Sequence, residues 1–197
     1  MRGAWAQEED LYRRSDIYRH NRMFFQGGQP YPLAEAERNK TDGIAMATQG
    51  VLIFRSTIDT GYEMLEMARQ ATIITAVAPR FPDMTFDNEG NEQCAKHEAR
   101  QKMYATIKAA CEAAKEAKCI VLIFSAFGCG AYKNPPREVA EILYSVLTDY
   151  QQSLMLVTIG IRDEIFEVGA APPSLPPNLA MQSQSNYEVF KEVFAFV

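Results

Sequence analysis

Two short segments of the chain contain residues whose types and spacing suit chemistry. The first, AQEEDLYRRSDIY at 6–18, opens with the adjacent carboxylates Glu8 and Glu9. Successive helical residues point about 100° apart, so two such carboxylates serve two neighbouring atoms rather than one. Glycoside cleavage needs an acid near the leaving oxygen and a second group near the reacting sugar. An acidic first turn that complements the helix dipole explains the pair as well, and the pattern alone favours this structural interpretation.

The second segment is SAFGCGAYKNPP at 125–136, which follows an apolar strand and opens a helix. Gly128 and Gly130 allow the backbone to approach an anion closely and to direct N–H groups at it. The segment also follows a strand directly, and ligands bind at the carboxyl ends of strands in open α/β sheets. The spacing fits neither a dinucleotide-binding fingerprint nor a Walker loop. A tight strand-to-helix turn explains this fragment equally well.

An alternation of strands and helices positions these two segments and predicts an α/β sandwich around a mixed, mostly parallel sheet. We expect one helix over 6–20, ending at His20, and a helix after residue 134, with Asn134 as its cap and Pro135 in its first turn. The expected strands are at 51–54 and 72–78, at 119–124, where both faces should be covered, and at 154–159, which should be buried. The expected helices are at 93–118 and 187–196, and the expected irregular stretches and loops are at 26–50, 83–92 and 169–185.

Apolar periodicity predicts which faces of the two central helices are buried. On the helix over 93–118 the buried stripe comprises Met103, Ile107, Ala110, Cys111 and Ala114. On the helix after residue 134 the inward face comprises Val139, Ile142, Leu143, Val146 and Leu147.

Composition narrows the classes of function. The chain has 197 residues, enough for one domain, and a formal net charge of -5, which disfavours a nucleic-acid backbone as the partner. With four cysteines, two histidines and no Cys-x-x-Cys pair, we expect no metal site. We expect no membrane segment and a cytoplasmic location, or a nuclear one in a eukaryote. His97 is expected to be exposed, and the oligomeric state stays open.

Together the two segments resemble the microbial-type poly(ADP-ribose) glycohydrolases. That family carries a triple glycine, then Gln-Glu-Glu and a helix rich in Leu and Arg, and later a glycine loop followed by Asn-Pro. The first run is matched by Gln7, Glu8, Glu9, Leu11, Arg13, Arg14 and Ser15, and the loop by 126–132 with Asn134 and Pro135. Weaker matches follow in the same order at 51–55, 74–80 and 186–194, so the resemblance runs nearly end to end.

The resemblance implies a macrodomain-like three-layer α/β/α sandwich over 1–197 that binds ADP-ribose or poly(ADP-ribose) on modified proteins. It implies hydrolysis of ribosyl O-glycosidic bonds without a metal or cofactor. Glu9 corresponds to the catalytic acid, Glu8 to the group that binds a ribose hydroxyl, and Gln7 to a supporting residue. The loop that would wrap the diphosphate and the distal ribose comprises Phe127, Gly128, Cys129, Gly130, Ala131 and Tyr132. Cys129 fits there as a small residue rather than a nucleophile.

One part of the family pattern is missing. The residues before Gln7 contain Gly3 but no triple glycine. We therefore expect a domain that is incomplete at its N-terminus and has impaired activity, because a lost loop removes backbone donors to the diphosphate. The alternatives are an ADP-ribose-binding module without catalysis and an inactive fragment.

Overall fold

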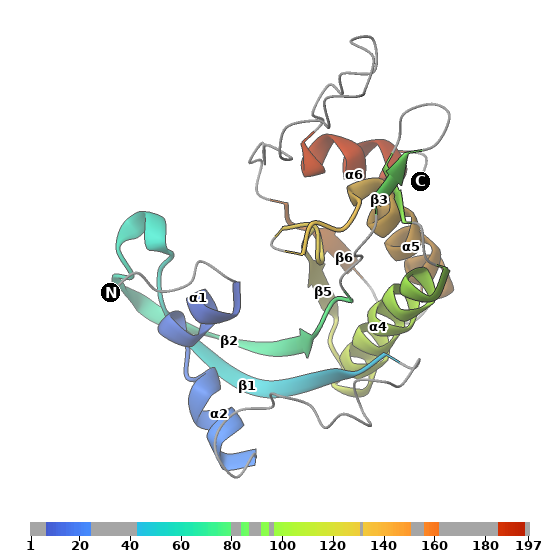
Figure 1. Cartoon of the computed structure of the whole chain (residues 1–197). Helices are drawn as coiled ribbons and strands as arrows, with labels where there is room; N and C mark the ends of the chain where they lie inside the picture. The colour runs from blue at the N-terminus through green and yellow to red at the C-terminus, as the bar shows by residue number, and fades with distance from the viewer. Residues whose placement is uncertain are drawn as a thin grey trace. The chain divides into compact units, whose positions relative to one another are not determined.

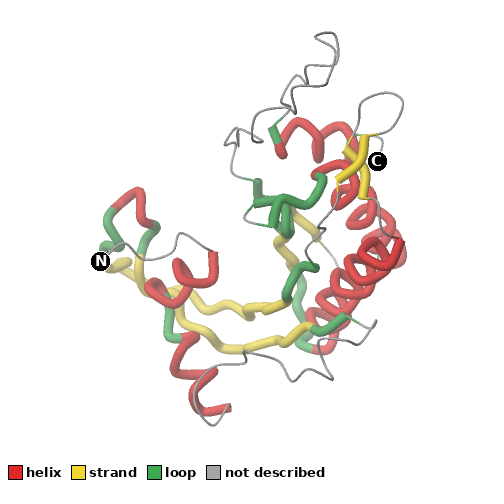
Figure 2. Tube along the Cα trace, in the orientation of Figure 1, coloured by secondary structure: helices red, strands yellow, loops and turns green. Residues whose placement is uncertain are grey.

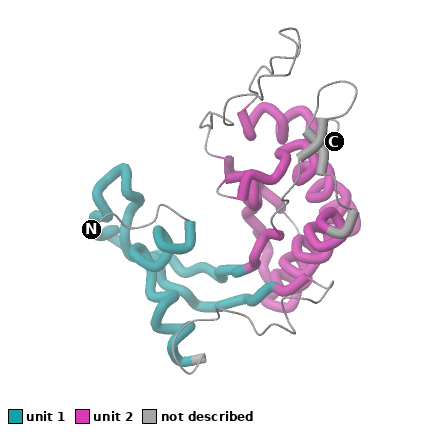
Figure 3. The backbone as a smooth tube through the Cα atoms, in the orientation of Figure 1, with its two compact units in different colours: residues 1–40, 45–75 teal, residues 41–44, 76–197 magenta. Residues whose placement is uncertain are grey.

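The computed structural model of the chain describes residues 7–24, 43–79, 84–86, 92–94, 97–130, 132–150, 156–161 and 185–195. The chain divides into two compact units (Figure 3). Unit 1 comprises 1–40 and 45–75, and unit 2 comprises 41–44 and 76–197. Each unit is described by itself below.

Unit 1 contains two short helices and a pair of long strands (Figure 1). Its elements are α1 (Gln7–Arg14), α2 (Ile17–Phe24), β1 (Ala45–Arg55), the 3₁₀ helix η1 (Ile58–Thr60) and β2 (Met64–Ala76). β1 and β2 are hydrogen-bonded neighbours, and η1 lies in the turn that joins them. Val51 of β1 and Ile17 of α2 are almost fully buried, so the helices cover the middle of β1.

The single helix expected over 6–20 is wrong, because the chain breaks between α1 and α2. Ser15 forms an isolated bridge with Ile53 of β1, and its Oγ donates to the Leu11 carbonyl at 2.6 Å. Asp16 and Leu52 exchange two hydrogen bonds, from Asp16 N to Leu52 O at 3.1 Å and from Leu52 N to Asp16 Oδ1 at 2.8 Å. The Asp16 N–H, which would donate within a continuous helix, therefore donates to β1 instead.

His20 consequently lies inside α2 and does not end the first helix. Its Nε2 lies 3.6 Å from Asp16 Oδ2, one turn earlier. The strands of unit 1 are also longer than expected, since β1 begins at Ala45 rather than 51 and β2 at Met64 rather than 72. Most of the additional part of β2 is exposed, and an exposed strand needs no apolar run.

Unit 2 contains helices α4, α5 and α6 and two short pairs of strands (Figures 1 and 2). The elements are β3 (Met84–Phe86), β4 (Glu92–Cys94), α4 (His97–Glu116), β5 (Val121–Phe124), α5 (Pro136–Asp149), β6 (Leu156–Ile159) and α6 (Asn186–Phe194). β3 and β4 pair antiparallel, so the loop expected over 83–92 is wrong in part. β5 and β6 pair parallel in the register Val121↔Leu156, with α5 as the crossover.

The core of unit 2 lies between α4 and α5, as the periodicity predicts. All five residues of the stripe expected on α4 are buried, and so are Val139, Ile142, Leu143 and Val146 on α5, whereas Leu147 is only half-buried. Two tyrosines tie the helices together: Tyr104 donates to Asp149 Oδ2 at 3.1 Å, and Tyr150 donates to Glu112.

Two further expectations for unit 2 are wrong. β5 is not covered on both faces, because Leu122 is 7% exposed whereas Ile123 is 71% exposed. Leu156 of β6 is likewise exposed. Asn134 does not cap α5: the cap position belongs to Pro135 and the helix begins at Pro136. The loop expected at 169–185 lies outside the described residues, apart from Ser185, whose Oγ accepts from Glu188 N at the start of α6.

The predicted α/β class is confirmed, with helices and both parallel and antiparallel strand pairs in the described part of the chain. The described strands form three two-stranded sheets. That the whole chain forms a single domain stays a prediction.

Candidate functional site

The acidic residues of the first segment occupy the opening turn of α1. Gln7, Glu8 and Glu9 are its first three residues, and Asp10 completes the turn. Asp10 pairs with Arg14 one turn later, with Oδ2 and Nη1 2.9 Å apart. This pair gives Asp10 a structural partner within the helix, so it is the least suited of the three carboxylates to a chemical role.

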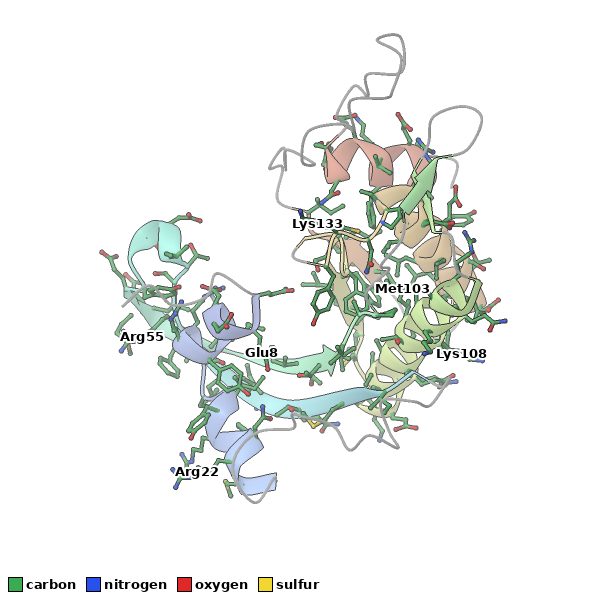
Figure 4. All side chains as sticks on the ribbon, viewed as in Figure 1. Glu8, Arg22, Arg55, Met103, Lys108 and Lys133 are labelled. Carbon is green, nitrogen blue, oxygen red and sulfur yellow. The ribbon has the colours of Figure 1, made fainter. Side chains whose placement is uncertain are left out.

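Glu8 has a perturbed carboxyl group. Partial burial raises the pKa of Glu8 above its ordinary value of 4.5, and the adjacent Glu9 carboxylate raises it further. Both causes disfavour the charged form, so Glu8 holds its proton to higher pH than an isolated glutamate. Figure 4 shows its side chain on α1. Perturbed carboxyl groups are typical of sites that move protons, although structural charge clusters also produce them.

The last turn of α1 is fastened to the strands of unit 1. Arg14 Nε donates to the Arg55 carbonyl of β1 at 3.4 Å, and Arg13 Nη1 donates to the Tyr62 hydroxyl at 3.5 Å. The Ser15 bridge to β1 lies immediately after these contacts. These contacts hold the last turn of α1 to β1 and to the turn that joins β1 and β2.

The second segment folds into a compact loop between β5 and α5. Four backbone hydrogen bonds shape it: Phe127 N to Ser125 O, Cys129 N to Ala126 O, Lys133 N to Gly130 O and Asn134 N to Gly128 O, at 2.8 to 3.2 Å. The N–H groups of Gly128, Gly130 and Tyr132 make no hydrogen bond within the described residues. Such unused donors in successive turns are the kind of groups that bind phosphate oxygens.

The two glycines of the loop are required for different reasons. Gly128 has φ +75°, and a Cβ there would lie 2.6 Å from Asn134 Nδ2 and 2.8 Å from Ala78 Cβ. Packing inside unit 2 thus demands glycine at 128. A Cβ on Gly130 would meet nothing within 4 Å, and its φ is not positive. The fold itself does not demand glycine at 130.

Asn134 is a residue of the loop whose role the sequence reasoning missed. It is 1% exposed, and its Nδ2 donates to the Pro79 carbonyl at 2.9 Å. Its backbone N–H also holds Gly128 O. An asparagine before Pro-Pro is typical of a cap, and sequence alone carries no signal for this contact with a distant segment.

The other predicted loop residues differ in exposure. Tyr132 is exposed, Phe127 is half-buried, and Cys129 is buried with its Sγ 3.8 Å from the Phe127 carbonyl. The buried, small Cys129 agrees with a packing role. Ala131 lies outside the described residues.

The structure places the predicted site residues in both units: the carboxylates in unit 1 and the loop in unit 2. Within the described ranges, no three His, Cys, Asp or Glu side chains gather in a group able to hold a metal ion. Nor does any described helix have the length and apolar character needed to cross a bilayer. His97 is among the residues whose side chains are not described.

Comparison of the sequence with family profiles and with curated proteins finds no match. Solved structures do match. A single-residue variant of poly(ADP-ribose) glycohydrolase from Deinococcus radiodurans in complex with ADP-ribose has a TM-score of 0.70 and 22% identity, covering 100% of this chain and 71% of that one. Another crystal form of the Deinococcus enzyme with ADP-ribose gives 0.68 and 22%, covering 99% and 69%. The enzyme from Thermomonospora curvata bound to the inhibitor ADP-HPD gives 0.66 and 22%, covering 98% and 63%.

These matches confirm, for the fold, the resemblance that the two motifs indicate. The chain has the macrodomain-like α/β fold of the bacterial poly(ADP-ribose) glycohydrolases. Identities of 20% to 22% do not by themselves carry an activity from one protein to another.

Proposed function

We propose that the chain is a glycosidase of the poly(ADP-ribose) glycohydrolase type, which binds ADP-ribose units on modified proteins and hydrolyses their ribosyl O-glycosidic bonds. The observation that carries the proposal is the loop at 127–132, in which three described N–H groups are unused and Gly130 has no structural reason to be glycine. The shared fold with enzymes solved in complex with ADP-ribose supports it.

The loop is proposed to bind the diphosphate. The N–H groups of Gly128, Gly130 and Tyr132 would donate to its oxygens, and the missing Cβ at Gly130 lets a ligand approach the backbone. Phe127 and Tyr132 supply aromatic surface for the sugar. Charge-assisted hydrogen bonds of this kind contribute about 1.5–3 kcal/mol each.

The carboxylates are proposed to carry the cleavage. Glu9 would act as the general acid and donate a proton to the leaving ribosyl oxygen as the bond from the anomeric carbon to that oxygen breaks. A water molecule then adds its hydroxyl to the anomeric carbon, and its remaining proton returns to Glu9. Glu8, whose pKa is raised, would hydrogen-bond a ribose hydroxyl, and Gln7 would support the pair. The location proposed is the cytoplasm, or the nucleus in a eukaryote.

The test is release of ADP-ribose from a poly(ADP-ribosyl)ated protein, followed by chromatography. We expect release by the unmodified chain and a loss of at least about a hundredfold in Glu9→Gln. Glu66→Gln, an exposed carboxylate on β2 of the same unit, is the matched control and should leave the rate unchanged. Equal rates in the chain and in Glu9→Gln would remove Glu9 from its role.

Calorimetric titration with ADP-ribose separates the alternatives. Binding without release would favour the alternative, a non-catalytic ADP-ribose-binding module. Absence of binding at millimolar ligand, with an intact circular-dichroism spectrum, would contradict both the enzyme and the module.

A further inference from the structure

Lys133 has an unusual backbone conformation. With φ +53° it is one of three non-glycine residues in the described part of the chain, together with Tyr62 and Lys118, that occupy the left-handed region. That conformation costs free energy for any residue with a Cβ, and glycine or asparagine adopts it more readily. A lysine at such a position requires a reason.

The other two positions have structural reasons. Lys118 follows the last turn of α4, where Cys119 N donates to Ala114 O in the pattern that commonly ends a helix. Tyr62 lies in the turn between β1 and β2, and its hydroxyl and carbonyl accept hydrogen bonds from Arg13 and Arg55. Both residues end or turn an element of the fold.

For Lys133, the loop explains the conformation but not the side chain. Its N–H donates to Gly130 O at 2.9 Å and closes the turn that begins there. Its side chain is exposed and makes no ion pair or hydrogen bond within the described residues. In Figure 4 it extends from the loop rather than into the core around Met103.

Two arginines of unit 2 are already paired. Arg137 lies 2.5 Å from Glu192, and Arg100 pairs with the buried Glu138. Among the described residues of the loop at 126–134, Lys133 is the only lysine or arginine, so it is the cation that the loop offers to a ligand. Because the whole chain carries a net charge of -5, an anion approaching it is repelled at long range, and a local positive charge offsets that repulsion.

We propose that Lys133 is a further ligand-binding residue, whose ammonium group pairs with the diphosphate of the ligand held by the loop. The inference rests on the proposed function and extends it, because it assigns a cation to a site that otherwise relies on backbone dipoles. A lysine acts there as a mobile point charge on a flexible stem, so it adds affinity for the anion without fixing its geometry.

The test compares the affinity for ADP-ribose of Lys133→Gly, Lys133→Arg and the unmodified chain at two salt concentrations. Loss of one partly exposed charge contact should raise the Kd of Lys133→Gly about five- to tenfold and flatten its salt dependence. Lys133→Arg should bind within about twofold of the unmodified chain, because the charge is kept. Lys133→Gly should also melt at the same or a higher temperature, because the strain is relieved.

Lys118→Gly is the matched control. It removes the same charge and the same left-handed side chain elsewhere in unit 2, so it should change the melting temperature similarly and leave the Kd unchanged. Adenosine serves as the uncharged ligand, and Lys133→Gly should not alter its affinity.

The outcomes separate the two proposals. If the unmodified chain binds ADP-ribose and Lys133→Gly binds it equally well, the role of Lys133 is overturned and the proposed function stands. An equal loss of affinity for adenosine also overturns it, since the effect would then come from loop shape rather than charge. If the unmodified chain binds no ADP-ribose, both the proposed function and the role of Lys133 are overturned.

Discussion

The side-chain amide of Asn134 donates a 2.9 Å hydrogen bond to the carbonyl oxygen of Pro79, fifty-five positions earlier in the chain. The same residue holds Gly128 O through its backbone N–H. Asn134 thus contacts Gly128 through its backbone and Pro79 through its side chain, and it holds the glycine loop against the segment that follows β2. The conformation of the loop depends on a residue that does not belong to the predicted set of ligand contacts.

Replacement of Asn134 by alanine should destabilise the chain. It leaves the partly buried Pro79 carbonyl without its donor, which costs about 1–3 kcal/mol of unfolding free energy. Urea denaturation measures the change. Thr148→Ala, at an exposed position of α5, is the control and should stay within about 0.5 kcal/mol. An Asn134→Ala protein as stable as the unmodified chain would contradict the role of this hydrogen bond.

Alanine at the two loop glycines should separate folding from binding. Gly128→Ala combines a left-handed backbone with overlap against Asn134 and Ala78, and should cost at least about 2 kcal/mol of stability. Gly130→Ala meets no atom and should change stability by less than about 0.5 kcal/mol. If the loop binds a diphosphate, Gly130→Ala nevertheless weakens ADP-ribose binding, because its methyl group enters the space of the ligand. Calorimetric titration compares the affinity of Gly130→Ala for ADP-ribose with that of the unmodified chain. An unchanged affinity would count against the loop as the ligand site.

The carboxyl of Glu8 should titrate above 4.5 in the folded chain. Glu9→Gln removes the second cause of the shift and should lower the pKa of Glu8, but not to its ordinary value, because partial burial persists. NMR titration of carbon-labelled glutamate measures it, with Glu66→Gln as the control. A Glu8 pKa that does not change in Glu9→Gln would show that the two carboxyl groups do not interact.

The sign of the effect on stability follows from the same shift. A carboxyl with a raised folded-state pKa binds its proton more tightly in the folded chain. Its contribution to stability is therefore complete below pH 4.5 and is lost as the pH rises through the folded-state pKa. Glu8→Gln should abolish this part of the pH dependence of unfolding.

Cys111 should be inert toward alkylation in the folded chain. It is fully buried, and burial, with a smaller contribution from the Glu112 carboxylate, raises the pKa of its thiol to about 12. The thiolate is the reactive form, so iodoacetamide at mildly alkaline pH should modify the half-buried Cys119 first. Peptide mapping by mass spectrometry follows both sites, and concentrated guanidinium chloride should remove the difference. Labelling of Cys111 as fast as Cys119 without denaturant would contradict the burial.

The sequence predicts α4 and α5 well because their apolar residues recur at helical spacing over many turns. The stripe from Met103 to Ala114 is buried as expected, and the parallel pair formed by β5 and β6 follows from the strands that flank α5. These elements depend on burial of one face, which is a property that a single sequence displays.

Features decided by contact with a distant strand were not predictable. The break at Ser15 exists because Asp16 pairs with Leu52, and nothing near Ser15 in the sequence encodes that partner. The continuous apolar run of β5 predicts cover on both faces, yet Ile123 is exposed. For the candidate site, the residue types were identified from two motifs. Only the structure shows which N–H groups of the loop are unused, and why packing requires glycine at 128 but not at 130.

The bridge from Ser15 to Ile53 anchors the C-terminal end of α1 on β1, and this anchor is the pivot about which α1 would tilt. Glu9 lies six helical residues from that pivot, about 9 Å along the axis. A tilt of about 10° at the pivot would swing the carboxylate sideways by about 1.5 Å, and misplacements of about 1 Å slow enzymes on the order of a hundredfold. If Glu9 has the proposed catalytic role, a substitution at Ser15 that tilts α1 would therefore displace the Glu9 carboxylate at the far end of the helix.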